Sequence, residues 1–318
     1  MIVSDEKVSV IICAYSMERL RDTHEAVDSV LAQTLKPHEL ILAIDHNKEL
    51  FHRLESELPP EIKLVLNEGP HGLSETRNAG IRSSSGEIVA FIDDDAVAEH
   101  NWLENLIPPF EDSRVMAVGG QAVPLWPGDK PPFWFPEDFD FVIGCTAHKQ
   151  LLLRANSEIR NVTGSNMAFR KEVFQKLGLW EGALGRCDGG RVKFNPTGGE
   201  EAELCLRIKT NMPDSVILFR PESVVHHKVT SQRATLKYVF DFCFREGITR
   251  AMMRKIVSHY GQKPLAAENL FLRRLLSTSI PRRLKRFYRL ANLAQVGVIT
   301  ANLSLMATGY LLGRWKYR

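Results

Sequence analysis

Three consecutive aspartates, Asp93, Asp94 and Asp95, stand directly behind the apolar run EIVAFI. Adjacent like charges repel one another, so the arrangement needs a compensating partner or full exposure to water. A calcium loop of the EF-hand type is excluded, because Val97 and Ala98 occupy the positions that need an oxygen ligand and a glycine. A helix N-cap needs only one aspartate. A divalent cation that is shared with a substrate diphosphate remains as one hypothesis, beside a solvated loop.

Two other polar residues stand at the ends of predicted elements. Asp45 closes the run ILAID, and a carboxylate there can accept hydrogen bonds from a base N–H or from ribose hydroxyls. Arg77 lies in GLSETRNAG at the start of a predicted helix, where a guanidinium can pair with phosphate. Both features are compatible with a nucleotide ligand.

Two further pairs of residues are candidates for proton transfer and metal binding. Glu200 and Glu201 follow two glycines at a helix start, where acids also interact favourably with the helix dipole. Instead of only stabilising the helix, one glutamate of this pair can act as a general base. His226 and His227 follow a strand-like run, and a neutral imidazole is a common ligand of divalent metals, although such pairs are more often ordinary surface or core residues.

The first 120 residues alternate between apolar runs of strand length and segments with helical spacing. Strands are predicted at 8–14, 39–44, 62–66, 87–92 and 115–120, and helices at 17–33, 48–58, 73–84 and 101–110. Apolar strands separated by helices predict an α/β fold with a mostly parallel sheet covered on both faces. Ligands bind outside the carboxyl ends of the strands in such sheets, and the three aspartates follow one of these ends.

The pattern changes after residue 124. Residues 124–160 are rich in proline and aromatics and predict a long loop, which either carries function or covers the sheet. Beyond it, helices are predicted at 170–178, 201–211 and around 233–256, and strands at 215–219 and 223–227.

The C-terminal part of the chain is strongly basic. No acid follows Glu268, so the first 268 residues hold 31 of the 41 basic and all 38 acidic side chains. Residues 290–313 form an uncharged run with basic and aromatic residues on both sides. This pattern predicts a helix at an anionic membrane surface, with a soluble core helix and a membrane span as the alternatives.

The ordered set of motifs resembles the family 2 glycosyltransferases of the GT-A fold. The matching segments cover about residues 7 to 230 and read VSVIICAYSMERL, ELILAIDHN, GLSETRNAGIRSSSGEIVAFIDDDA, TGSNMAFRKEVFQKLGLW, GGEEAELCLRI and VVHHKV. The segment FWFPEDFDFVIGCTAHK looks closest to enzymes of the glucosyl-dolichyl phosphate glucuronosyltransferase type. The resemblance implies a GT-A domain over 1–230, with a nucleotide-binding half (1–120) and an acceptor half (121–230), and a membrane-associating tail over 231–318.

The resemblance also implies a set of residues on the donor side of the site. These are Ala14, Tyr15 and Glu18 around the nucleotide, Asp45 at the base and Arg77 near the diphosphate. The motif CAYSMER lacks the proline that is common after the first strand of the family, which leaves the individual contacts of this segment open.

The aspartate run matches the D-x-D motif of the family. Asp95 is then expected to bind Mn²⁺ or Mg²⁺, with Asp93 or Asp94 nearer the ribose. His227 falls where the family often has a metal-linked histidine. The cation would neutralise the leaving diphosphate as a Lewis acid.

The remaining expected roles concern the acceptor. Glu201 falls on the catalytic-base position of the family, where Asp is commoner, so Glu200 stays a candidate for the same role. The base would deprotonate the acceptor hydroxyl as it attacks the anomeric carbon, with inversion of configuration. The segment Gly164–Asn166 is expected to shape the acceptor side.

These inferences predict an inverting, metal-dependent glycosyltransferase that moves a sugar from a UDP-sugar to a lipid-linked saccharide at the cytoplasmic face of a membrane. A soluble or cell-surface polysaccharide acceptor is one alternative, and a non-catalytic nucleotide-sugar-binding protein is another. The acidic body argues against a nucleic-acid partner. Glucuronic acid is one candidate donor sugar, and its carboxylate would need a basic partner such as Lys149, Arg154 or Arg170. The scattered cysteines favour reduced thiols.

Overall fold

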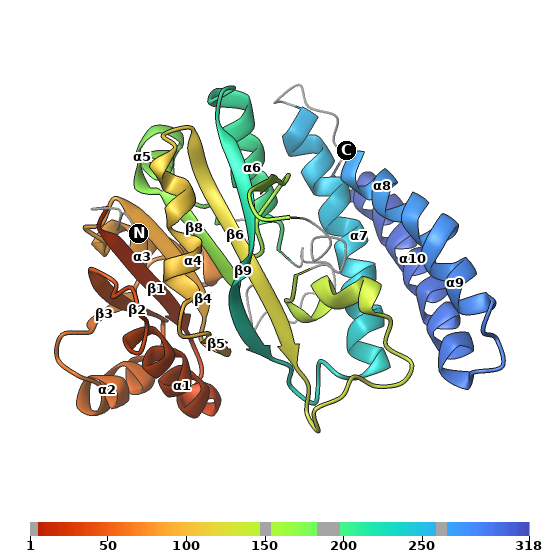
Figure 1. Cartoon of the computed structure of the whole chain (residues 1–318), viewed down its shortest axis with the longest axis horizontal. Coiled ribbons are helices and arrows are strands. Elements are labelled where there is room, and N and C mark those ends of the chain that lie inside the picture. The colour runs from red at the N-terminus through yellow and green to blue at the C-terminus, as the bar shows by residue number, and fades with distance from the viewer. Residues whose placement is uncertain (1–5, 147–153, 183–197, 259–265, 318) are drawn as a thin grey trace. The chain divides into compact units, whose positions relative to one another are not determined.

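A computed structural model describes residues 6–146, 154–182, 198–258 and 266–317 of the chain (Figure 1). Lys149, one of the basic residues considered above, lies outside the described residues. The chain divides into two compact units. Unit 1 comprises residues 1–123, 153–190 and 200–227, and unit 2 comprises 124–152, 191–199 and 228–318. In this division the proline-rich segment after residue 123 groups with the C-terminal helices, and the expected boundary at residue 230 stays a prediction.

Unit 1 is built on one mixed sheet with the strand order β3-β2-β1-β4-β8-β6-β9-β5, and β7 pairs with β9. The strands are β1 (Val8–Ala14), β2 (Glu39–Asp45), β3 (Lys63–Asn67), β4 (Ile88–Asp93), β5 (Ala96–Ala98), β6 (Val115–Leu125), β7 (Ser157–Glu158), β8 (Asn166–Arg170) and β9 (Val216–Lys228).

The sheet is parallel only in its first half. The pairs β1–β2, β1–β4 and β2–β3 are parallel, whereas β8 pairs antiparallel with both β4 and β6. The sequence pattern predicted the parallel strands, but β5 and β8 were not predicted, and β9 is one strand where two were expected. These strands are short or only half apolar, so their identity depends on the neighbours with which they pair.

Helices cover both faces of this sheet because its buried strands are apolar on both sides. In β1, Val10 and Ile12 face one core cluster while Ile11 faces the other, as the alternation of side chains along a strand requires. The first face carries α1 (Leu20–Leu31), α2 (Lys48–Glu57) and α4 (Trp102–Leu106), and the second carries α3 (Leu73–Ser83), α5 (Lys171–Leu177) and α6 (Glu200–Asn211). Two short 3-10 helices complete the unit, η1 (Met17–Arg19) and η2 (Pro108–Glu111).

Unit 2 consists of helices and the proline-rich segment. Its helices are η3 (Glu137–Ile143), α7 (Leu236–Ser258), α8 (Ala266–Arg274), the π-helical turn η5 (Leu275–Ser279), α9 (Ile280–Leu284) and α10 (Leu290–Lys316). Its core joins aromatic residues of the proline-rich segment, such as Phe135 and Phe139, to Val239 of α7 and Ile299 of α10. The predicted loop is therefore part of the core of this unit.

Helices α7 and α10 approach each other closely through glycines. A Cβ added to Gly309 would overlap the carbonyl oxygen of Phe244, and one added to Gly247 would overlap the carbonyl oxygen of Met306. Small residues permit this separation because the backbones themselves are in contact. By length and composition α10 is also apolar enough to cross a membrane, with 28% of its most apolar window buried.

We expect Gly309→Ala to lower the free energy of unfolding by about 1–3 kcal/mol, since the new methyl group would force two backbones apart. Gly297→Ala is the matched control, because Gly297 lies on α10 with nothing within 4 Å of the added Cβ. Removing a helical glycine there should stabilise the chain by up to about 1 kcal/mol. Urea unfolding of both full-length variants measures the difference, and equal changes would contradict the close packing.

Candidate functional site

Polar residues gather at the carboxyl edge of the parallel strands. Asp45 at the end of β2 pairs in register with Asn67 of β3, and Asp93 at the end of β4 pairs with Cys13 of β1. Parallel strands end on the same edge of the sheet. The pairing of the strands therefore brings these side chains together, whatever the sequence of the connecting segments.

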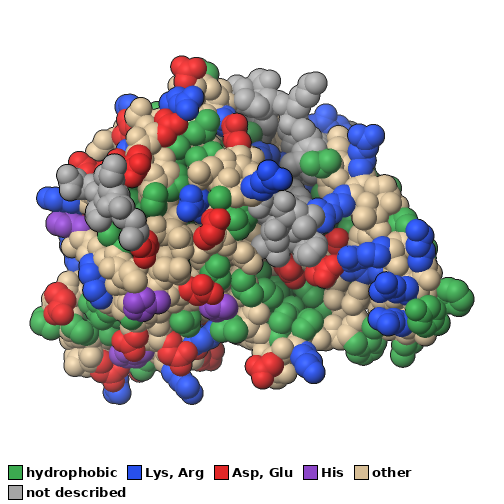
Figure 2. Space-filling model, viewed as in Figure 1, with side chains coloured by type: hydrophobic (Ala, Val, Ile, Leu, Met, Phe, Trp, Pro, Cys, Tyr) green, Lys and Arg blue, Asp and Glu red, His purple; other side chains and the backbone are tan. Residues whose placement is uncertain are grey.

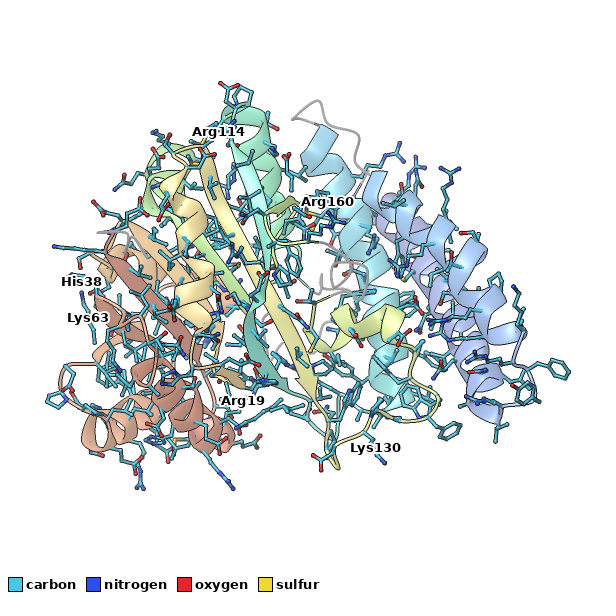
Figure 3. The ribbon with its side chains drawn as sticks, in the orientation of Figure 1. Arg19, His38, Lys63, Arg114, Lys130 and Arg160 are labelled. Atoms are coloured by element: carbon cyan, nitrogen blue, oxygen red, sulfur yellow. The ribbon has the colours of Figure 1, made fainter. Side chains whose placement is uncertain are left out.

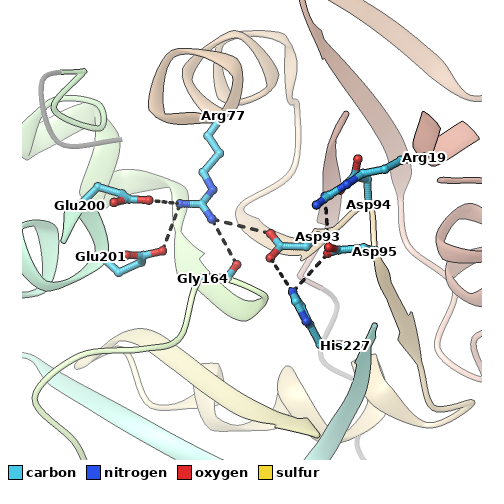
Figure 4. A network of polar contacts seen from close by, with 9 residues as sticks. All are labelled: Arg19, Arg77, Asp93, Asp94, Asp95, Gly164, Glu200, Glu201 and His227. Carbon is cyan, nitrogen blue, oxygen red and sulfur yellow. Dashed lines mark hydrogen bonds and ion pairs between the residues drawn. The ribbon is translucent and has the colours of Figure 1, made fainter. Parts of the chain in front are cut away.

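Asp93, Asp95 and His227 form a group whose candidate ligand atoms lie within 4.8 Å of one another. His227 Nε2 lies 3.6 Å from Asp93 Oδ2 and 3.2 Å from Asp95 Oδ1. The antiparallel pairing of β5 with β9 causes this convergence, because it places His227 opposite Ala96, the residue that follows Asp95. The three side chains meet in Figure 4.

The two neighbouring histidines of β9 point to opposite faces of the sheet, as successive strand residues do. His227 is buried, whereas His226 is half-buried and its Nε2 lies 3.1 Å from Glu99 Oε1. The metal-ligand prediction for His227 is thus compatible with its position, and His226 is directed away from the aspartates.

Asp94 serves a different purpose from its neighbours. It is buried, and its Oδ1 accepts a hydrogen bond of 2.8 Å from Arg19 Nη1, which also lies 3.1 Å from Asp95 Oδ2 (Figures 3 and 4). The expectation that Asp93 or Asp94 lies nearer the ribose stays a prediction, and the structure shows that Asp94 is engaged by Arg19. Sequence reasoning missed Arg19, because 75 positions separate it from Asp94 along the chain.

The electrostatics of the run follow from this packing. Burial, together with the charges of Asp95 and Asp93, raises the pKa of Asp94 to about 7 even though Arg19 opposes the shift. Burial also acts to raise the pKa of Asp93, but the nearby His227 imidazole and the charge of Arg77 outweigh it, so the pKa falls below its usual value. Asp93 is therefore an ionised carboxylate at neutral pH.

Arg77 of α3 is a buried guanidinium that joins three carboxylates. Its Nη1 lies 3.1 Å from Glu200 Oε1 and 3.3 Å from Glu201 Oε1, and its Nη2 lies 3.9 Å from Asp93 Oδ1 (Figure 4). Burial opposes its charge, but Glu201 and Glu200 raise its pKa above the ordinary value. Arg77, which was predicted to lie near a diphosphate, therefore also links the aspartates to the start of α6.

The two glutamates at the start of α6 differ in access to solvent. The Glu200 side chain is 3% exposed, whereas the Glu201 side chain is 18% exposed. Gly198 and Gly199 precede them with φ of 140° and 107°, a backbone conformation that favours glycine. Glu201 is therefore the more accessible of the two carboxylates.

Gly164 lies directly beside this pair. Its carbonyl oxygen accepts a hydrogen bond of 3.4 Å from Arg77 Nη2, and a Cβ added to it would overlap Glu201 Oε1. The neighbouring Asn166, which was expected on the acceptor side, is instead fully buried. Its Oδ1 accepts 2.8 Å from Trp102 Nε1 and its Nδ2 donates 2.9 Å to the Ser223 carbonyl oxygen. Asn166 therefore holds core elements together rather than lining a substrate site.

Asp45, the residue expected to bind the nucleobase, has two hydrogen-bond partners. Asp45 accepts hydrogen bonds from Asn67 Nδ2 at 2.9 Å and from the Gly72 backbone N–H at 3.0 Å, which ties the start of α3 to β2. Asp45, His46 and His71 form a second group with ligand atoms within 4.8 Å, and the two imidazole rings stack at 3.7 Å. Both histidines are exposed, and the Asp45 oxygens are already hydrogen-bonded, so this group suits a cation less well than the aspartate–histidine group.

The first-strand motif and the basic candidates occupy distinct positions. Ala14 is buried at the end of β1, the Tyr15 carbonyl oxygen accepts 3.0 Å from Asn47 Nδ2, and Glu18 is exposed. Arg170 pairs in register with Ile88 at the other end of β4 from Asp93, and its Nη1 binds Glu6 at 2.8 Å. Arg170 is therefore removed from the candidates for a sugar carboxylate.

The donor set fits a hard divalent cation. Two carboxylates, from the end of β4 and the turn after it, converge with one imidazole from β9, and the partly exposed Asp93 leaves room for further oxygen ligands. Beside them stand a buried guanidinium and a partly exposed carboxylate. Such an arrangement can bind a diphosphate and accept a proton from a hydroxyl.

Sequence comparison places the chain among known proteins. The sequence model of glycosyl transferase family 2 matches residues 9–178, more than half of the chain. The glucosyl-dolichyl phosphate glucuronosyltransferase of Haloferax volcanii is 34% identical over 315 residues, which cover 96% of each protein. The succinoglycan biosynthesis protein ExoM of Rhizobium meliloti is 26% identical over 79% of this chain and 76% of its own length.

Solved structures show the same fold. The mannosyltransferase PcManGT from Pyrobaculum calidifontis, in complex with GDP-Man and Mn²⁺, superimposes with a TM-score of 0.61 at 15% identity, covering 96% of this chain and 87% of that one. GalNAc-T7 with UDP, GalNAc and Mn²⁺ gives a TM-score of 0.52 at 17% identity, covering 85% and 54%. The architecture of both is that of the GT-A glycosyltransferases, as predicted.

We expect His227→Ala to weaken Mn²⁺ binding about tenfold or more, because it removes one of three convergent ligands. His226→Ala is the matched control, since it changes the adjacent residue on the opposite face of β9 and should leave binding unchanged. Isothermal titration of the full-length protein with Mn²⁺ measures both. Equal affinities for the two variants would show that the aspartate–histidine group does not hold the cation.

Proposed function

We propose that this chain, which belongs to glycosyl transferase family 2 and is a hexosyltransferase, moves a sugar from a UDP-sugar to a saccharide carried on a polyprenyl or dolichyl phosphate. The observation that carries the proposal is the single polar network at the carboxyl edge of the sheet. It joins Asp93, Asp95 and His227 to Arg77 and Glu201 within one unit. A donor diphosphate and an acceptor hydroxyl would find complementary groups there.

The lipid-linked acceptor is supported by the Haloferax volcanii relative, whose name states a dolichyl phosphate acceptor and a glucuronosyl donor. Similarity over 96% of both chains includes the basic C-terminal region as well as the site. Glucuronic acid is therefore the sugar that we propose to test first. Among the basic residues considered, Arg154 is described and exposed, and it remains a candidate partner for the sugar carboxylate.

Glu201 is the proposed catalytic base. Its carboxylate would take the proton of the acceptor hydroxyl while that oxygen bonds to the anomeric carbon, and the bond from this carbon to the diphosphate breaks, with inversion. Arg77 holds Glu201 in place through the 3.3 Å contact and keeps its charge compensated. A positioned general base contributes about 10²–10⁴-fold to such a step.

On the donor side, Asp45 would accept a hydrogen bond from the base, and Ala14, Tyr15 and Glu18 would line the nucleotide. Asp95, His227 and Asp93 would hold Mn²⁺ or Mg²⁺. When bound, the cation supplies Lewis-acid stabilisation of the negative charge that develops on the leaving diphosphate. Arg19 supports this arrangement because it compensates Asp94 and Asp95 from the side away from His227.

We further propose that unit 2 docks on an anionic membrane surface at the cytoplasmic face. Phe287 and Tyr288, in the turn before α10, are 64% and 71% exposed, and Leu290, the first residue of α10, is 73% exposed. Lys and Arg side chains gather beside hydrophobic ones over the region of α9 and α10 (Figure 2). Exposed aromatics flanked by arginines suit the interface, and basic segments favour the cytoplasmic side.

A docked helix fits α10 better than a membrane span does. One face of α10 packs against α7 through Gly309, and Arg254 of α7 donates 2.8 Å to the Tyr310 hydroxyl. Asn302 is also fully buried in this region. A spanning α10 would have to leave a charged neighbour or carry it into the bilayer, which is costly.

A soluble or cell-surface polysaccharide is the second candidate acceptor. The observation in its favour is the similarity to ExoM, whose name refers to succinoglycan biosynthesis. Competition between a lipid-linked glucose and an oligosaccharide acceptor in one assay distinguishes the two.

We expect Glu201→Gln to lower kcat about 10²–10⁴-fold while UDP binding is retained, because only the base is lost. Glu200→Gln is the comparison variant, since its carboxylate is buried behind Arg77 and should affect folding more than kcat. The assay offers UDP-glucuronate, UDP-glucose and GDP-mannose with dolichyl-phosphate-linked glucose, in Mn²⁺ and in EDTA. Unchanged turnover of Glu201→Gln would contradict the assignment of Glu201 as the catalytic base. Turnover with GDP-mannose alone would contradict a UDP-sugar as the donor.

We expect the double variant Phe287→Ser, Tyr288→Ser to lower partitioning onto anionic vesicles about tenfold or more, because two exposed rings no longer enter the interface. Leu236→Ser is the control, since Leu236 is a 40% exposed apolar residue at the start of α7. Vesicle co-sedimentation of the full-length variants measures the effect. Equal losses in both variants would contradict a specific docking surface.

A further inference from the structure

Unit 2 contains a cavity of about 460 Å³ that the proposed catalytic site does not use. It lies between the proline-rich segment and the region from α9 to the start of α10. One part of its wall is apolar and consists of Pro124, Trp126, Pro131 and Phe135. The part contributed by α9 and the turn after it carries three arginines, Arg282, Arg283 and Arg286. The lining therefore combines apolar side chains from one segment with cationic side chains from another.

Two of the three arginines already have partners. Arg283 is buried, and its Nη1 lies 3.0 Å from Asp138 Oδ2 while its Nε donates 2.7 Å to Gln295 Oε1. Arg282 Nη2 lies 2.6 Å from Glu137 Oε1 at the exposed margin. These contacts fix the basic wall in place.

Arg286 is different. Its backbone carbonyl oxygen accepts 2.9 Å from Asn292 Nδ2, but within the described part of the chain no acid pairs with its guanidinium. The remaining acid of the wall, Asp140, does not cancel this charge. Burial and the neighbouring charges of Glu137 and Asp138 raise the pKa of Asp140 to about 8, so that carboxyl is mostly neutral at pH 7.

The apolar wall is a rigid aromatic surface. The Trp126 and Phe135 rings lie with centroids 4.8 Å apart, and Phe135 also contacts Trp134 at 6.0 Å. A free inorganic anion would gain nothing from this wall. A phosphate esterified to a hydrocarbon chain would use both walls, since its charge would meet Arg286 and its first carbons would pack on Trp126.

The residues around the cavity connect it to the proposed membrane surface. Gln295 lines the cavity and donates 3.1 Å to the Phe133 carbonyl oxygen, and the Phe133 side chain is 60% exposed. Phe287, which follows Arg286 directly, is 64% exposed. Exposed apolar side chains thus continue from both walls, as a site that receives a lipid from a bilayer requires.

We propose that this cavity binds the phosphate of a polyisoprenyl-phosphate carrier, with Arg286 as the anion ligand and Trp126 and Phe135 as the surface for the start of the chain. The proposal rests on the proposed function, because it assigns a place to the lipid part of the acceptor. One unpaired guanidinium matches the single negative charge of a sugar-bearing phosphodiester.

The test compares three probes on the full-length protein by quenching of tryptophan fluorescence: farnesyl phosphate, farnesol and inorganic phosphate. We expect farnesyl phosphate to bind at least about tenfold more tightly than either of the others, since only it uses both walls. Farnesol that binds as tightly would overturn the role of the phosphate. Inorganic phosphate that binds as tightly would overturn the role of a lipid.

Arg286→Gln should weaken farnesyl phosphate binding about tenfold or more through loss of a charge-assisted contact. Arg289→Gln is the matched control, an exposed arginine three residues further on that does not line the cavity. Equal losses in the two variants would show general attraction to the basic tail and would overturn the cavity assignment. Trp126→Ala provides an independent variant of the aromatic part of the lining, with the same expected direction, and four tryptophans, Trp134 among them, remain as reporters.

A kinetic readout separates this proposal from the proposed function. Arg286→Gln should raise the KM for dolichyl-phosphate-linked glucose and leave UDP release in the absence of acceptor unchanged. Wild-type protein that binds farnesyl phosphate but transfers no sugar to the lipid would contradict the proposed acceptor and not the cavity. Sugar transfer with equal KM values in wild type and Arg286→Gln would contradict the cavity and not the acceptor.

Discussion

The buried guanidinium of Arg77 is the constraint on which the site depends. A cation in the core is costly unless carboxylates surround it, and removal of one partner from a buried ion pair typically costs about 3–5 kcal/mol. Arg77 meets this requirement through Glu200, Glu201 and Asp93, which come from two distant segments, and through the faces of Phe91 and Trp180 at 6.0 and 5.5 Å. The same contacts hold the strand end that carries the aspartates at a fixed distance from the start of α6.

The buried charges of Asp94 and Asp95 also need a compensating cation. Arg19 neutralises Asp94 and Asp95 from η1, so the repulsion within the aspartate run is reduced where the side chains are buried. Asp93 remains the most accessible of the three. The run therefore divides into one residue that stabilises the turn and two that face His227, and this division suits a shared diphosphate cation better than three equivalent ligands would.

Unit 2 shows how a segment without regular structure acquires a role through packing. The proline-rich segment contributes Phe135 and Phe139 to a core with α7 and α10, and its acids Glu137 and Asp138 pair with Arg282 and Arg283. The two alternatives considered for this segment, packing and function, are therefore compatible. The basic residues that made the tail conspicuous are partly used within the unit, and those left over are the ones available to an anionic ligand or surface.

The sequence by itself determined the local features of this protein. The parallel strands β1 to β4, the aspartates at a strand end and the glycines before Glu200 follow from periodicity and backbone preference, which act over a few residues. The tertiary structure decided which side chains meet. The pairing of β5 with β9 places His227, which the family resemblance had already indicated, beside Asp95. The burial of Asn166 removes it from the substrate side, and Arg19 became visible only when η1 packed beside Asp94. These outcomes depend on strand register and on burial by segments that are distant in the sequence. The local sequence of one segment specifies neither of them.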